Sequence, residues 1–309
     1  MTFFVVESKR DGWNISHMLL SYDERYYLFA RKIYDLAESM SKEKKMKILV
    51  CIKQVPENLK QLQINSQKTG IIISEKMRFR INRFDAHAVE AAVQLKEKFP
   101  DTTIDIVTVG PASSDTIVKR AMGMGADNGL IIKIDSETYI SPSKISAILA
   151  KIATQKQYDF IFTGIMSEDQ MNAQTGQMLA AKLNIPSISG VVDIQLTDKK
   201  LCVVREREGG IHEHLEISIF ELNKGILFTI QAGINQPRYP SLSALLKANA
   251  REIRILDIQD LVSKGLSDDQ SISAINRAEN VRQGKFVEGS IVEKVRQFIE
   301  IMKERNFLQ

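Results

Sequence analysis

Short unbroken runs of apolar residues alternate with segments of helical periodicity through the middle of this 309-residue chain. A strand that is apolar at every position must be buried on both faces of its sheet, and intervening helices provide that burial when the strands are parallel. The sequence therefore predicts an α/β fold with a doubly wound, mostly parallel sheet of the Rossmann-like kind. We expect strands at 47–52, 104–109, 130–134 and 160–163, and helices at 85–98, 113–122, 143–154 and 174–183.

The pattern changes after Pro186, where turn residues instead of helices separate the apolar stretches. Short connections favour antiparallel neighbours, so we expect these strands to be antiparallel and to extend or flank the sheet. An earlier hairpin is predicted over residues 62–74, because Lys68-Thr69-Gly70 supplies a turn between two apolar stretches. The later strands are expected at 191–196, 201–205, 215–219 and 226–230.

Composition divides the chain into three regions. Residues 1–45 are rich in aromatic side chains, and Leu28, Ile33 and Leu36 have approximate helical spacing. This region is either a genuine N-terminal extension, helical or poorly ordered, or the product of a start placed upstream of the true one. Residues 46–234 form the expected α/β domain. Residues 235–309 are expected to form a docking loop and a polar arm, mobile or lying on a partner, that closes with an amphipathic helix at 290–305.

Charge and cysteine usage exclude several classes of function. A net charge of +4 and a pI near 8.8 are too mild for a nucleic-acid-binding protein, which needs clustered basic and aromatic residues. Cys51 and Cys202 lack the spacing of a zinc site or a redox motif, and so few cysteines fit a reducing compartment. No apolar run reaches the ~20 residues that span a bilayer, and the N-terminus lacks the order of a secretory signal. We expect a cytoplasmic protein without a metal site, nucleic-acid partner or membrane insertion.

Motifs for catalysis are also absent from the sequence. There is no P-loop, and the histidines have no serine or cysteine partner pattern. Gly123, Gly125 and Gly129 nearly match a dinucleotide fingerprint, but they follow a helix and precede a strand, which is the reverse of that motif's context. A glycine helix end followed by a turn explains them. We therefore expect no catalytic residue in this chain.

A polar loop follows the strand expected at 160–163 and leads into the helix that opens at Gln174. Ligands of open α/β sheets bind beyond the carboxyl ends of the strands, and the free N–H groups of a helix start attract phosphate. Thr175 adds a hydroxyl group, and Gly176 lets a ligand approach the backbone. Plain N-capping of the helix would give the same pattern, so the loop alone leaves both interpretations open.

Several segments together resemble the β subunits of electron transfer flavoproteins, in the same order over about residues 46–260. The loop over 164–178 looks like that family's AMP-phosphate loop. Further segments are similar to the family's opening strand and turn (47–56), its Asn-Pro-Phe-(Asp/Cys) helix entry (82–92) and its Ala-Met-Gly-Ala-Asp signature (121–127). The most specific stretch is Pro-Arg-Tyr-Pro-Ser-Leu at 237–242, followed by Lys-Ala at 247–248.

The resemblance implies an AMP site and a docking loop. The adenine and ribose would be lined by Cys51, Asn82, Arg83, Phe84, Asp85 and Val109, with Phe84 towards the flavin of a partner subunit. The phosphate would be held by Gly164, Asp169, Gln170, Ala173, Gln174 and Thr175. Arg238, Tyr239 and Leu242 would form the docking loop, whose leucine enters an apolar pocket of acyl-CoA dehydrogenases in family members. Taken alone, Leu242 fits a core leucine at a helix start equally well.

Departures from the family pattern concern the nucleotide more than the fold. Met166-Ser167-Glu168-Asp169 replaces the usual Gln-Ala-Ile-Asp, and Gln170 and Ala173 replace common polar or acidic ligands. Arg83 stands where proline is usual. An extra Gly-Met within 121–127 is expected to lengthen the turn near the site.

The function that the resemblance implies is electron transfer by a heterodimer with an FAD-carrying α subunit. Electrons would pass from acyl-CoA-type flavin dehydrogenases towards a quinone oxidoreductase, with AMP bound in this chain. A second interpretation is an electron-bifurcating version, in which this chain holds a second FAD and NADH is the donor. Lys53-Gln54-Val55-Pro56 favours that version, whereas the loop at 174–178 favours AMP. A third, from another class, is a stand-alone adenine-nucleotide sensor, which needs no Pro-Arg-Tyr loop.

Overall fold

The computed structural model describes residues 45–58, 62–68, 70–72, 74, 77–134, 139–197, 200–218, 225–261, 272–276, 286–305 and 307. The chain divides into two compact units, Met1–Gln61 with Ser74–Ser271, and Leu62–Ile73 with Ile272–Gln309. The first contains the sheet and is called the main unit below. The expected N-terminal helix lies outside the described residues.

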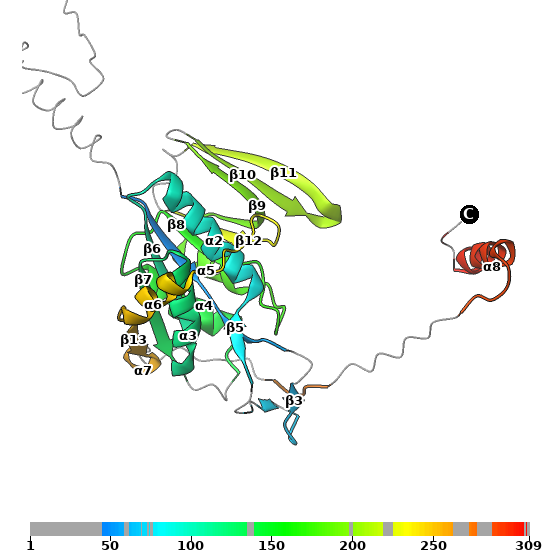
Figure 1. Cartoon of the computed structure of the whole chain (residues 1–309), viewed down its shortest axis with the longest axis horizontal. Coiled ribbons are helices and arrows are strands. Elements are labelled where there is room, and N and C mark those ends of the chain that lie inside the picture. The colour runs from blue at the N-terminus through cyan, green and yellow to red at the C-terminus, as the bar shows by residue number, and fades with distance from the viewer. Residues whose placement is uncertain are drawn as a thin grey trace, which may run out of the picture. The chain divides into compact units, whose positions relative to one another are not determined.

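A single large sheet forms the centre of the main unit (Figure 1). Within the described residues it holds nine strands in the order β11-β10-β9-β12-β8-β1-β6-β7-β13. Strands β1, β6, β7 and β8 pair in parallel with their neighbours, which confirms the predicted doubly wound α/β fold. The strands are β1 (Lys47–Cys51), β6 (Thr103–Gly110), β7 (Asn128–Lys133), β8 (Phe160–Gly164), β9 (Ser187–Leu196), β10 (Lys200–Arg207), β11 (Ile211–Ser218), β12 (Ile226–Ile230) and β13 (Arg254–Asp257).

The direction of β12 corrects the sequence analysis, which grouped residues 226–230 with the antiparallel strands. β12 instead lies between β8 and β9 and pairs in parallel with both. All of its residues are buried. Such a strand needs helices on both faces of the sheet, and a position in the middle of the sheet provides them. Among the described strands of this sheet, antiparallel pairing is confined to β9–β10 and β10–β11, which extend from one end of it (Figure 1).

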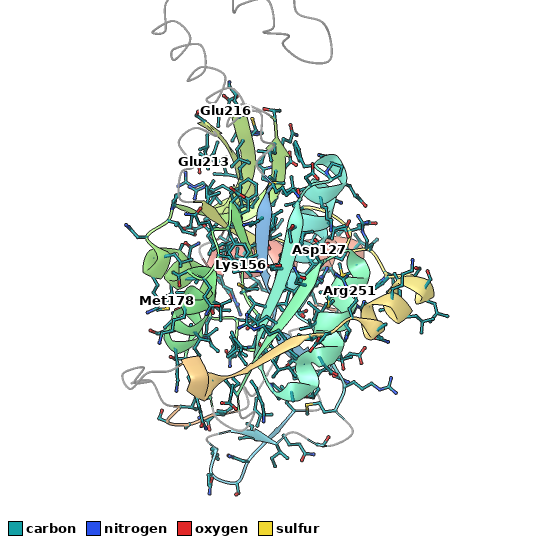
Figure 2. All side chains as sticks on the ribbon, turned by 90° about the vertical axis from the view of Figure 1, so that its left-hand side faces the viewer. Asp127, Lys156, Met178, Glu213, Glu216 and Arg251 are labelled. Carbon is teal, nitrogen blue, oxygen red and sulfur yellow. The ribbon has the colours of Figure 1, made fainter. Side chains whose placement is uncertain are left out.

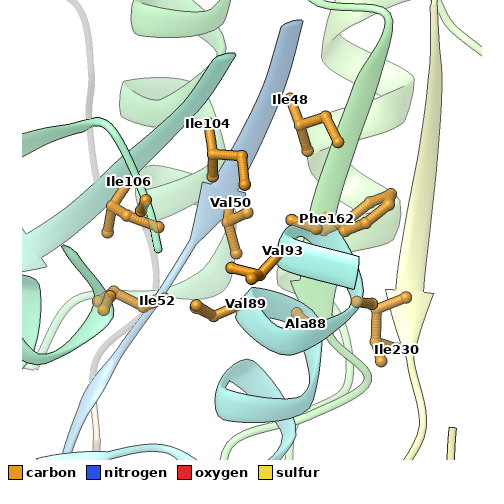
Figure 3. Close-up of a cluster of buried hydrophobic side chains, with 14 of the residues drawn as sticks. Ile48, Val50, Ile52, Ala88, Val89, Val93, Ile104, Ile106, Phe162 and Ile230 are labelled. Atoms are coloured by element: carbon orange, nitrogen blue, oxygen red, sulfur yellow. The ribbon is translucent and has the colours of Figure 1, made fainter. Parts of the chain in front are cut away.

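Helices cover both faces of the sheet, and alternate residues of β1 point to opposite faces. Ile48 and Val50 join the cluster beneath α2 and α3, whereas Leu49 joins the cluster beneath α4 and α5. Figure 3 shows the first cluster, in which Val89 of α2 lies against these strand residues. The helices are α2 (Arg83–Lys98), α3 (Asp115–Met124) after a short 3-10 turn η3 (Ala112–Ser114), α4 (Pro142–Ala153) and α5 (Thr175–Leu183).

The helix ends follow simple local rules. α3 ends at Gly125, whose φ of 134° is a conformation that glycine adopts more readily than other residues. This confirms the predicted helix end and turn. α4 begins at Ser141, whose side chain accepts a hydrogen bond from the Lys144 N–H. Asn184, with a left-handed φ of 53°, ends α5.

The sheet continues past residue 234, where the sequence analysis ended the α/β domain. Helix α6 (Leu242–Ala250) packs on α3, where Gly123 leaves space for Leu245 and Pro240. Strand β13 then pairs in parallel with β7 at the edge of the sheet, and α7 (Ile258–Leu261) follows it. β13 and α7 gave no sequence signal because each is only four residues long, whereas α6 was missed although most of its residues are apolar. A small ladder of β2 (Gln54–Pro56) and β5 (Phe79–Ile81) completes the main unit.

The second unit confirms two further predictions. The hairpin expected over residues 62–74 is present as β3 (Gln63–Ile64) and β4 (Ile71–Ile72). The closing amphipathic helix is α8 (Ile291–Glu304), which starts with a reciprocal capping box between Ser290 and Glu293. Across the described residues of both units, no helix is long and apolar enough to cross a membrane.

Candidate functional site

The carboxyl ends of β1 and β8 meet at the point where the strand order reverses. From β1 the chain moves outward to β6 and β7, and α4 then carries it back to β8 on the other side of β1. Ligands of open α/β sheets bind at such a switch point, beyond the carboxyl ends of the strands. Predicted site residues lie on both strand ends, with Cys51 closing β1 and Gly164 closing β8.

Asp85 joins the two strand ends. One carboxylate oxygen accepts a hydrogen bond from the Lys53 N–H at 2.7 Å, and the other accepts one from the Gly164 N–H at 2.9 Å. A side chain on Gly164 would collide with Asp85, so glycine at this position permits the close approach of α2. Burial raises the pKa of Asp85 to about 7, although its hydrogen bonds oppose that change.

The loop that follows β8 is fixed on the start of α2. The Asn82 side chain donates to the Met166 carbonyl at 2.8 Å and accepts from the Glu168 N–H at 3.0 Å. Arg80 forms an ion pair with Glu168 at 3.0 Å, and Lys53 forms one with Asp169 at 2.7 Å. Predicted residue Asp169 therefore has a cation of this chain as its partner, and the acidic loop is locally neutralised.

The start of α5 is left without a side-chain cap. Gln174 occupies the N-cap position and makes no capping hydrogen bond, as is also the case at the starts of α2 and α3, whereas serine side chains cap α4, α6 and α8. The first N–H groups of a helix have no partner within the helix and carry a partial positive charge. Just before this start, Met171 and Ala173 have left-handed φ values of 53°, an unusual conformation for residues other than glycine. This combination suits an anionic ligand.

Gly176 has a different role from the one that the sequence suggested. A side chain here would lie 2.6 Å from the Thr163 hydroxyl oxygen and 2.7 Å from a Thr229 methyl carbon. The residue is buried against β8 and β12. Gly176 therefore lets α5 pack close to the strands, which is not the approach of a ligand that the sequence analysis expected.

Buried polar atoms without a partner gather near the carboxyl ends of the central strands. Within the described residues, these side-chain atoms are Gln54 Oε1, Thr108 Oγ1 and Ser114 Oγ. Gln54 follows β1, whereas Thr108 and Ser114 flank the end of β6, where Val109 is half-buried. Buried polar groups are rarely left unpaired, and a polar ligand at this edge is one way in which these atoms would gain a partner.

The predicted site residues fall into two groups. The first lies at or next to the carboxyl edge described above: Cys51, Asn82, Arg83, Phe84, Asp85, Val109, Gly164, Asp169, Gln170, Ala173, Gln174 and Thr175. Sequence reasoning missed Lys53, Arg80 and Glu168 as members of this cluster. Lys53 follows the end of β1 closely, so the rule that selected the loop after β8 would also have found it.

Cys51 is buried at the end of β1. Burial, with a further contribution from the Asp85 charge, raises the pKa of its thiol well above the usual range. The side chain therefore stays a neutral thiol and acts as a small apolar group. Among the described residues, no group of histidine, cysteine and acidic side chains could hold a metal ion.

The second group is formed by Arg238, Tyr239 and Leu242, which lie at the start of α6. Tyr239 is 78% exposed and Leu242 is 76% exposed, so the structure excludes the interpretation of Leu242 as a core leucine. Leu246, one helical turn later, is also exposed at 61%. The Arg120 guanidinium lies 4.9 Å from the centre of the Tyr239 ring. Exposed apolar residues that are this close in sequence mark a candidate interaction surface.

Comparisons with known proteins point to one family. The family model described as electron transfer flavoprotein domain matches residues 69–261. The electron transfer flavoprotein subunit beta of Methylophilus methylotrophus is 31% identical, with 84% of this chain and 98% of that protein covered. The subunit of the same name from Thermoanaerobacterium thermosaccharolyticum is 30% identical, with 85% and 100% covered. The Caffeyl-CoA reductase-Etf complex subunit CarD of Acetobacterium woodii is 31% identical, with 70% and 80% covered.

Proposed function

This chain belongs to the electron transfer flavoprotein β-subunit family, and from that premise we propose that it is the nucleotide-holding half of an electron-carrying heterodimer. The α subunit carries FAD, which supplies the redox chemistry, and electrons pass from acyl-CoA-type flavin dehydrogenases towards a quinone oxidoreductase. This chain contributes bound AMP, a docking surface and a scaffold. The observation that carries the AMP assignment is the uncapped start of α5 at the switch point of the sheet.

Charges at the carboxyl edge support a phosphate ligand. Lys53 and Arg80 neutralise the two acidic residues of the loop after β8. Arg83, which the resemblance placed on the adenine and ribose side, is exposed, and among the described residues no ion pair of its guanidinium is found, so we assign this cation to the phosphate instead. The raised pKa of Asp85 leaves it partly protonated at neutral pH, which reduces its repulsion of an anion.

The neutral half of AMP also finds suitable partners. Gln54, Thr108 and Ser114 have buried oxygen atoms that lack partners among the described residues. Hydroxyl and amide groups of this kind bind the hydroxyl groups of a ribose and the nitrogen atoms of an adenine. Cys51 and Val109 provide apolar surface at the ends of β1 and β6, on the face of the sheet that α4 and α5 cover, whereas Thr108 points to the opposite face.

The proposed α subunit has a suitable contact in the second unit. Helix α8 has large apolar residues at helical spacing, of which Ile291, Val295 and Phe298 are between 52% and 81% exposed. An exposed apolar stripe on a helix is stabilised when it packs against another surface. We assign that surface to the α subunit, which α8 would bind through this stripe.

Co-expression with an FAD-binding α-like subunit tests the proposal. The complex is purified and denatured, its flavin is counted per heterodimer, and the released nucleotides are identified by mass spectrometry. One FAD and one AMP per heterodimer is the expected result. Arg83→Gln is the informative variant, since it keeps the fold and removes a proposed phosphate contact, so it should lower the AMP content at unchanged FAD content.

Other outcomes of this experiment identify the alternatives. Two FAD molecules without AMP would replace the shuttle by the bifurcating version, with NADH as donor. A stable monomer or homodimer that binds an adenine nucleotide and ignores the α subunit would point to the nucleotide sensor. Turnover by the purified chain alone would contradict all three proposals.

A further inference from the structure

The guanidinium of Arg238, whose side chain is 36% exposed, pairs with two carboxylates of α2. Its Nε and Nη2 atoms donate to the two oxygens of Glu90 at 2.9 and 2.8 Å, and its backbone N–H donates to the same carboxylate at 3.1 Å. The Glu90 side chain is only 4% exposed. A buried carboxylate that is matched by a planar fork of donors fixes the position of both partners.

A second carboxylate completes this arrangement. Nη1 and Nη2 of Arg238 donate to the oxygens of Glu97 at 2.5 and 3.2 Å, so the guanidinium lies between two acidic residues of α2. The pKa of Glu97 is lowered, chiefly by its hydrogen bond from Arg238. Lysine has three donors on a single nitrogen and no planar fork, so it could not form a two-point pairing with each carboxylate as Arg238 does. The Glu90–Arg238–Glu97 cluster is therefore specific for arginine.

Neighbouring residues fasten the same segment at further points. On the N-terminal side, the Asn235 side chain donates to the His87 carbonyl at 3.0 Å and contacts the His87 ring at 3.0 Å. On the C-terminal side, Arg251 donates to the carbonyls of Ala126 and Asp127, close to the Asp127 side chain (Figure 2). Helix α6 is thus held at both ends by hydrogen bonds to α2 and to the turn after α3.

Between these anchors, α6 has one packed face and one free face. Leu245 lies against Gly123 of α3, and Ala248 is buried. Tyr239, Leu242 and Leu246 are exposed, and Leu242 and Leu246 are one helical turn apart. The apolar face is therefore presented by a segment whose backbone is fixed before any partner arrives, which lowers the entropy lost on binding.

We propose that Arg238 is a positioning residue for docking. Through Glu90 and Glu97 it holds the start of α6 so that Tyr239, Leu242 and Leu246 form one preformed apolar face, which fits an apolar pocket on a flavin dehydrogenase. The inference rests on the proposed function, because it uses the docking role of Leu242. It assigns Arg238 a role within this chain, whereas the sequence resemblance placed it among the residues that dock.

The test measures electron transfer from a purified acyl-CoA dehydrogenase, with its acyl-CoA substrate, to the complete heterodimer. Four forms are compared: wild type, Leu242→Ala, the neutral pair Arg238→Met with Glu90→Gln, and the combination of all three changes. The neutral pair avoids leaving Glu90 buried without its cation. Thermal unfolding and hydrogen exchange of β6 verify that each form is folded.

The neutral pair should raise the KM for the heterodimer about 10-fold with kcat within about 2-fold of wild type. Because Arg238 acts through the position of Leu242, the combined variant should be no worse than Leu242→Ala alone. Hydrogen exchange of residues 237–246 should become faster in the neutral pair, and the change in KM should not depend on salt. A fifth form, Arg238→Lys, keeps the charge without the planar fork, so its KM should lie between those of the wild type and the neutral pair.

The outcomes separate this inference from the proposed function. If Leu242→Ala leaves KM unchanged, the docking role itself is refuted. If Leu242→Ala raises KM but the neutral pair does not, Arg238 does not position the segment. Additive effects that weaken with salt would show that Arg238 contacts the dehydrogenase directly, which also overturns the inference.

Discussion

The protonation of Asp85 gives the most specific prediction for the candidate site. This carboxyl group is buried between the ends of β1 and β8, and its pKa is raised to about 7. In the unfolded chain its pKa returns to about 3.8, the usual value of an aspartate. Below about pH 4 the group is protonated in both states. Between about pH 4 and 7 the folded state keeps a proton that the unfolded state has lost.

The sign of the effect follows from this difference. Because the folded state binds more protons in that window, the free energy of unfolding falls as the pH rises, and it stops falling above about pH 7. A shift of about three pKa units corresponds to about 4 kcal/mol at most, at about 1.4 kcal/mol per unit. For a folded domain as large as the main unit, a loss of about 4 kcal/mol in the free energy of unfolding lowers Tm by on the order of 10 °C.

Asp85→Asn isolates this contribution from the other ionisable groups. Asparagine cannot ionise, so the Tm of the variant should lack the pH dependence that Asp85 causes. The asparagine amide accepts a hydrogen bond from only one of the two N–H groups, which lowers the stability of the variant by the same amount at every pH. The Tm of the wild type minus that of the variant should therefore decrease between pH 5 and 7.5. A difference that stays constant over this range would refute the raised pKa and the proposed weak repulsion of phosphate.

Two further predictions concern residues at the same strand ends. Gly164→Ala places a methyl group about where the Asp85 carboxylate and Phe84 lie, so it should destabilise the protein by about 1–3 kcal/mol. The control is Gly233→Ala, where the added methyl group meets open space and only the φ of 99° is unfavourable, so it should destabilise the protein by only about 1 kcal/mol. Equal losses in thermal unfolding would contradict the close approach of α2. Alkylation with iodoacetamide, followed by peptide mapping, should modify the half-buried Cys202 well before Cys51, because burial raises the pKa of the Cys51 thiol. Faster modification of Cys51 would show that the end of β1 is open.

The sequence predicts the parallel core well because burial on both faces leaves a direct signal. The strands at β1, β6, β7 and β8 are apolar at nearly every position, and the helices between them keep their period. The direction of β12 has no such signal. A short apolar run looks the same whether it is parallel or antiparallel, so only the pairing with β8 and β9 decides it.

The site could be predicted in place but not in its contacts. Residues after the ends of buried strands are expected to meet at one edge of a parallel sheet, which located Gly164 and the start of α5, whereas Asp85 of α2 was found only through the family resemblance. The pairing of Lys53 with Asp169 and of Arg238 with Glu90 joins residues more than one hundred positions apart. Such partners depend on how the elements pack, so they cannot be predicted from the local sequence.

A crystal structure of the heterodimer with AMP would test the central claim most directly. The account predicts that the phosphate lies at the start of α5, with its oxygen atoms about 3 Å from the first backbone nitrogens of that helix and within reach of the Arg83 guanidinium. It also predicts that the redox-active flavin lies in the α subunit. A phosphate bound elsewhere, or a carboxyl edge filled by side chains of the loop after β8, would contradict it.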